Sequence, residues 1–85
     1  MQVEVILMKR EDFGENNYDF RNYSLGSFEV EIVPRIGETV YYEVDNDDGP
    51  GFYNVKFVYH HIEPKSPTKI IIISDDDEEY FDGKR

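Results

Sequence analysis

The chain has 85 residues, of which 19 are Asp or Glu and nine are Lys or Arg, so its formal net charge is −10 at pH 7. This length allows one domain with a small core, and the absence of cysteine excludes disulfides and thiolate metal ligands. The anionic balance argues against direct binding to nucleic acid or to an anionic membrane, because phosphate binding depends on clustered Lys and Arg.

The first quarter of the chain contains one clear strand pattern. Apolar and polar residues alternate over residues 2–9, which predicts a half-buried strand. Residues 10–17 are polar and predict a loop. For residues 18–23 an edge strand and an irregular segment both remain open, so the structure of the whole segment 10–25 is undecided at this point.

The middle of the chain has a strand, a turn and a second strand. Alternation over residues 26–33 predicts a strand that ends at Pro34, since proline cannot donate to a sheet ladder. Residues 35–38 predict a turn in which Gly37 takes a positive φ angle. Alternation resumes over residues 39–44.

A cluster of turn-forming residues, 45–51, precedes the strongest apolar face in the sequence. This strand places Val58 on its outer side and four residues inward: Tyr53, Val55, Phe57 and Tyr59. Prolines at 64 and 67 end it. The last strand, residues 68–74, contains four consecutive isoleucines, which indicates burial on both faces.

Four to six short strands joined by tight turns predict a mostly β fold, either a small antiparallel barrel or a sandwich. The stretch Val33–Val40, followed by a hairpin and then Tyr53-x-Val55-x-x-Val58-x-His60, resembles the middle of small SH3-like barrels in short bacterial and phage proteins. The resemblance implies a fold and no chemistry. We expect a single β domain over residues 1–74 and an acidic C-terminal tail over 75–85, where repulsion between like charges favours disorder.

Evidence for catalysis or for a bound metal is weak. His61 and Glu63 share one face of a strand and could serve a hydrolase, but no nucleophile accompanies them. The acidic turn that begins at Asp45 fails the calcium-loop pattern, since its twelfth position is Lys56. We therefore expect a protein that is not an enzyme and that needs no cofactor and no metal.

The leading interpretation is a protein-interaction module whose acidic surface binds a basic protein, such as a nucleic-acid-binding protein. A sharper form is a phage or mobile-element inhibitor that mimics the charge of DNA. The residues assigned to the partner are Glu29, Glu31, Glu43, Asp45, Asp47, Asp48, Asp75, Asp76, Asp77, Glu78, Glu79, Tyr80 and Phe81.

The alternative is a structural or accessory subunit that forms homo-oligomers through exposed aromatic residues. The candidates for that interface are Tyr18, Phe20, Tyr23, Tyr41 and Phe52. The first ten residues lack the pattern of a signal peptide, and no apolar run approaches the roughly 20 residues of a membrane helix. A cytoplasmic location with no membrane association is the default expectation.

Overall fold

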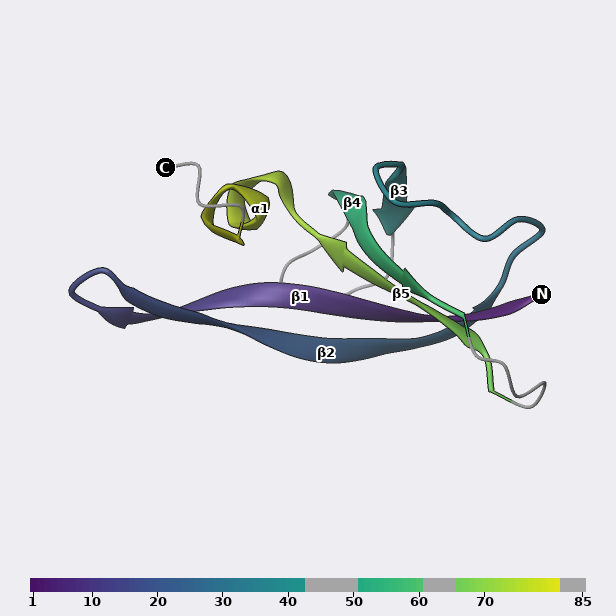
Figure 1. Cartoon of the computed structure of the whole chain (residues 1–85), viewed down its shortest axis with the longest axis horizontal. Coiled ribbons are helices and arrows are strands. Elements are labelled where there is room, and N and C mark those ends of the chain that lie inside the picture. Colours follow the sequence, from purple (N-terminus) through teal and green to yellow (C-terminus); the bar gives the residue numbers. More distant parts are fainter. Residues whose placement is uncertain (43–50, 61–65, 82–85) are drawn as a thin grey trace.

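A computed structural model describes residues 1–42, 51–60 and 66–81, and this part of the chain contains five strands and one helix (Figure 1). The elements are β1 (Gln2–Gly14), β2 (Asn17–Glu29), β3 (Thr39–Tyr42), β4 (Gly51–Tyr59), β5 (Thr68–Ile73) and α1 (Asp75–Phe81). The prediction of a mostly β fold is confirmed. Within the three described ranges, no helix has the length and apolar character needed to cross a membrane.

All five strands join one sheet in the order β2-β1-β5-β4-β3. Three of the pairs are antiparallel, but β1 and β5 run parallel, and β2 and β3 are the two edges, so the sheet is mixed and not closed. The edges nevertheless curl toward each other. The rings of Phe28 on β2 and Tyr42 on β3 meet edge to face with centroids 6.0 Å apart.

The segment that had been predicted as a loop, residues 10–17, is instead the end of a long hairpin. β1 and β2 remain paired up to Gly14 and Asn17, and the two residues between them, Glu15 and Asn16, both have positive φ angles. Such a pair is typical of the two-residue hairpin turn that matches strand twist. Pairing of β5 with β1 ends at Met8, so the outer part of the hairpin projects beyond the other strands (Figure 1).

The connection between the two edge strands begins earlier than predicted, since β2 ends at Glu29 and residues 30–33 lie outside any strand. It ends in the predicted turn, where the Glu38 amide donates to the Arg35 carbonyl at 3.0 Å and Gly37 has a φ of 91°. That prediction is confirmed. The predicted strand 39–44 is β3 as far as Tyr42; its last two residues and most of the following turn lie outside the described residues.

Apolar residues fill both faces of the sheet, and the alternation of β5 explains how. Ile70 and Ile72 join the larger cluster on one face, and Ile71 and Ile73 join a smaller cluster on the other. All four are buried, so the expected burial of this strand on both faces is confirmed. The larger face also contains Val3, Val5, Leu7, Tyr53 and Val55.

A β-bulge in β4 corrects the predicted inward face of this strand. Val55 pairs with Ile72, but the next paired residue is Phe57, opposite Ile71, so the ladder skips Lys56. One extra residue reverses the alternation beyond it. Val58 therefore packs against the larger core, while Phe57 turns to the opposite face.

Candidate functional site

Residues 75–81 of the acidic segment form the helix α1, and the local sequence explains why. The Ser74 hydroxyl accepts a hydrogen bond from the Asp77 amide at 3.3 Å, which is the contact of an N-cap residue. Four carboxylates occupy the first turn, where the positive end of the helix dipole favours negative charge.

Aromatic rings attach α1 to the smaller apolar face of the sheet. Phe81 packs edge to face against Phe20 and Phe57, with centroids 5.3 and 5.9 Å away, and Tyr80 packs against Tyr18 at 5.4 Å. Each such pair contributes about 0.5–1.5 kcal/mol beyond the area it buries. The rings of Tyr80 and Phe81, which the sequence analysis assigned to a partner, thus lie largely against the protein itself, although Phe81 remains 39% exposed.

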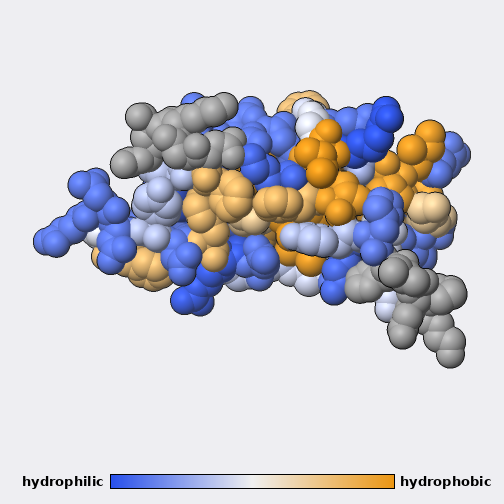
Figure 2. Space-filling view, viewed as in Figure 1, coloured by the Kyte–Doolittle hydropathy of each residue, from blue (hydrophilic) through white to orange (hydrophobic). Residues whose placement is uncertain are grey.

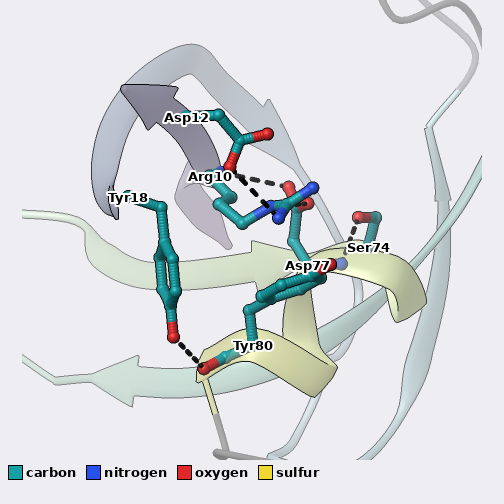
Figure 3. A network of polar contacts seen from close by, with 6 residues as sticks. All are labelled: Arg10, Asp12, Tyr18, Ser74, Asp77 and Tyr80. Carbon is teal, nitrogen blue, oxygen red and sulfur yellow. Dashed lines mark hydrogen bonds and ion pairs between the residues drawn. The ribbon is translucent and has the colours of Figure 1, made fainter. Parts of the chain in front are cut away.

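Arg10 on β1 is the centre of the polar contacts of α1 (Figure 3). Its guanidinium lies 3.7 Å from the centroid of the Tyr80 ring. Its Nε lies 3.6 Å from Asp77 Oδ1, and its backbone amide donates to Asp77 Oδ2 at 3.1 Å. Asp12 pairs with the same guanidinium at 3.2 Å. The Tyr18 hydroxyl donates to the Tyr80 carbonyl at 3.3 Å.

A second set of polar contacts joins α1 to β4. The Asn54 amide donates to Asp75 and, at 2.9 Å, to Glu78. Glu78 also pairs with Lys56, whose Nζ is 3.3 Å from Oε2. Asp75, Asp76 and Glu79 are the exposed carboxylates of the helix, and of these Asp75 accepts the Asn54 hydrogen bond.

The cations of the described ranges are largely engaged by the protein's own carboxylates. Five cations form six ion pairs: Arg10 with Asp12 and Asp77, Arg21 with Glu11, Arg35 with Glu38, Lys56 with Glu78, and Lys69 with Glu4. Lys9 also takes part in an interaction. Excess negative charge therefore resides on the carboxylates that form no ion pair with another described residue: Glu15, Asp19, Glu31, Asp75, Asp76 and Glu79.

The other carboxylates assigned to the partner have varied positions. The Glu29 carboxylate accepts a hydrogen bond from the N-terminal amino group. This hydrogen bond and the positive charge of the amino group lower the pKa of Glu29. Glu31 is exposed just after β2. The remaining four, Glu43, Asp45, Asp47 and Asp48, lie outside the described residues.

The five aromatic residues proposed for an oligomer interface divide into two groups. Tyr18 and Phe20 are half-buried beneath α1, and the Tyr23 hydroxyl donates to Glu11 at 2.8 Å. Tyr41 and Phe52 face each other across β3 and β4, with centroids 4.9 Å apart, and their exposed fractions are 51% and 70%. Tyr23 is also exposed, at 42%, so Tyr41 and Phe52 are the exposed members of the predicted set whose rings contact each other.

An apolar surface that the sequence did not reveal lies along the segment between β2 and β3. Ile32 is 81% exposed, although alternation had placed it inside a strand, and Ile36 at the turn is also exposed. A groove of about 530 Å³ lies beside this segment; it is lined by Ile32, Val33, Pro34, Glu38, Thr39 and Val40. Figure 2 shows hydrophobic side chains grouped away from the hydrophilic end of the β1–β2 hairpin.

No arrangement for catalysis emerges from the described ranges. His60 is exposed, with Nδ1 3.4 Å from the Thr68 hydroxyl, while His61 and Glu63 lie outside these ranges. No group of three or more His, Asp or Glu among the described residues is placed to hold a metal ion.

Comparison of the chain with protein-family models, with curated proteins and with solved structures finds no match.

Proposed function

We propose that this chain is a non-enzymatic protein-interaction module whose anionic surface binds a basic protein. The observation that carries the proposal is the pairing of cations within the fold. Five of the described Lys and Arg residues face the protein's own carboxylates, so these cations are engaged within the fold, and the chain that a partner meets has a net charge of −10.

The negative charge acts mainly on the rate at which the chain and its basic partner associate. Complementary potentials raise association rates, and this effect weakens as salt screens charge beyond about 8 Å at 0.15 M ionic strength. Exposed carboxylates occur in three places: Glu15 lies on the hairpin turn, Glu31 after β2 and Asp76 on α1. A basic surface is thus attracted from several directions before short-range contacts select one orientation.

A basic nucleic-acid-binding protein is the partner class that we favour, with DNA mimicry as the sharper form of the proposal. The test is competition: a labelled DNA duplex of about 20 base pairs is bound to a basic, sequence-nonspecific DNA-binding protein, and the chain is added at about 0.15 M salt. Release of the duplex, followed by fluorescence anisotropy, is the expected result. Retention of the duplex at a large excess of the chain would refute the sharper form, and failure to bind the basic protein at all would refute the proposal.

A second candidate function is an accessory subunit that self-associates through the Tyr41–Phe52 pair. The observation in its favour is the exposure of two large rings side by side, since contiguous apolar surface often marks an interface. Light scattering at high concentration separates the two functions, because a strict monomer excludes self-association.

A further inference from the structure

Deepening the proposed function, on which this inference rests, we infer that the outer edge of β3 binds an extended segment of the basic partner as an added strand. In the described part of the chain, β3 is a terminal strand of the sheet and pairs only with β4. A partner strand would find there unpaired backbone groups, an apolar groove on one side and an aromatic pair on the other.

The backbone geometry identifies which groups face outward. The Val55 amide donates to the Glu38 carbonyl at 2.8 Å, so Glu38 directs its carbonyl toward β4. Because antiparallel ladders alternate, Thr39 and Tyr41 direct their N–H and C=O groups away from β4. These groups can form the main-chain hydrogen bonds of an added strand, and such bonds supply affinity with little dependence on sequence.

Side chains on both sides of this edge set the pattern that a partner must have. On the side of the larger core, Val40 and Ile32 border the groove of about 530 Å³, which suits aliphatic side chains. On the opposite side, the Tyr41 and Phe52 rings are 51% and 70% exposed, and aromatic rings attract Arg and Lys. Successive residues of a strand point to alternate sides. The preferred segment therefore alternates aliphatic residues with Arg or Lys.

Charge selects this occupant over a second copy of the chain. Two copies each carry a net charge of −10 and repel each other, whereas a basic segment is attracted. Glu31 is exposed next to the groove residue Ile32 and forms no ion pair with another described residue. This carboxylate favours cationic residues along the bound segment.

The test uses two ten-residue peptides of identical composition, one alternating Arg and Val and one with five Arg followed by five Val. The alternating peptide is expected to bind at least fivefold more tightly and to slow amide hydrogen exchange at Thr39 and Tyr41 at least tenfold, as measured by NMR. Equal affinity, or protection confined to other elements, would overturn the docking site and leave the attraction to basic partners standing. Failure of both peptides to bind, even in low salt, would refute the proposed function as well.

Matched variants separate this site from general charge attraction. Phe52→Ser and Ile32→Ser should each weaken binding of the alternating peptide at least fivefold. Phe13→Ser, at a phenylalanine that is also exposed and lies on the far hairpin, and Ile36→Ser, on the neighbouring turn, should leave it unchanged. Equal losses in all four variants would overturn the assignment to β3. Unchanged amide chemical shifts away from each substitution verify that the variants fold.

Discussion

The guanidinium of Arg10 lies 3.7 Å from the centre of the Tyr80 ring, which joins the first strand of the sheet to the last helix of the chain. The same guanidinium approaches Asp77. Its Nε is buried and 3.6 Å from Asp77 Oδ1, and it makes no hydrogen bond to a described residue. The Tyr80 ring and the carboxylates of Asp77 and Asp12 therefore hold this cation. Since the ring and Asp77 belong to α1, substitution of Arg10 tests how firmly α1 is attached to the sheet.

Replacing Arg10 by Gln should destabilise the fold by about 1–2 kcal/mol, since a partly buried cation–π contact and an ion pair are lost together. Chemical denaturation followed by tyrosine fluorescence measures the change. Arg21→Gln is the control, because its exposed ion pair with Glu11 is expected to contribute no more than about 0.5 kcal/mol. An equal effect of the two substitutions would contradict the role given to Arg10.

Ser74 should matter for α1 through its hydroxyl. Ser74→Ala is expected to cost about 1 kcal/mol, because the N-cap acceptor for the Asp77 amide is removed. Ser74→Asp keeps an acceptor and should retain most of the stability. The backbone chemical shifts of residues 75–81 report whether the helix persists, and shifts in Ser74→Ala identical to those of the parent would contradict this capping.

Because of the β-bulge at Lys56, we expect Val58 to contribute more to stability than Tyr59, whereas simple alternation predicts the reverse. Val58→Ser should cost about 1–2 kcal/mol, since it removes a side chain that packs on the larger core and leaves a hydroxyl there. Tyr59→Ser should cost less, because more than half of that side chain is exposed. Denaturation midpoints of the two variants show which substitution costs more stability. A larger loss of stability for Tyr59→Ser would show that the bulge is absent in solution.

Tyr23 should titrate above the ordinary tyrosine pKa of 10.0. Its hydroxyl donates to the Glu11 carboxylate at 2.8 Å, and this hydrogen bond raises the pKa of Tyr23 because it favours the protonated phenol. The resulting stability is present below pH 10 and is lost as pH rises through the folded-state pKa. NMR titration of the ring carbons checks this; in Glu11→Gln the pKa should fall toward 10, and an unchanged value would contradict the cause.

Sequence reasoning predicted the mostly β class, the Gly37 turn and the two-sided burial of β5, because alternation and turn chemistry are local signals. It missed the hairpin turn at Glu15 and Asn16, since neither residue is the glycine that usually marks two positive φ angles. It also misassigned Phe57 and Val58, because it took the alternation to continue without a bulge; the apolar Val58 on the predicted outer side was the available signal. The resemblance to SH3-like barrels stays a prediction.

The structure of the acidic segment depends on contacts that lie far away in the sequence. Seven helical residues are too few to show a helical period, and a run of carboxylates resembles a disordered tail. Ser74 followed by acidic residues was the available signal for a helix start. The attachment to Arg10 and Phe20 could not be predicted, because it requires knowing that the β1–β2 hairpin continues beyond the other strands.

The central claim is that the anionic surface binds a basic protein. It is tested most directly by measuring how a variant with fewer exposed carboxylates binds such a protein. Glu15, Glu31, Asp76 and Glu79 are exposed and form no ion pair with another described residue, so replacing them by Gln should leave the fold intact. Calorimetric titration against one basic DNA-binding protein should show affinity reduced by about tenfold or more at low salt and a weaker dependence on salt. Equal affinity and equal salt dependence in the variant and the parent would contradict the account.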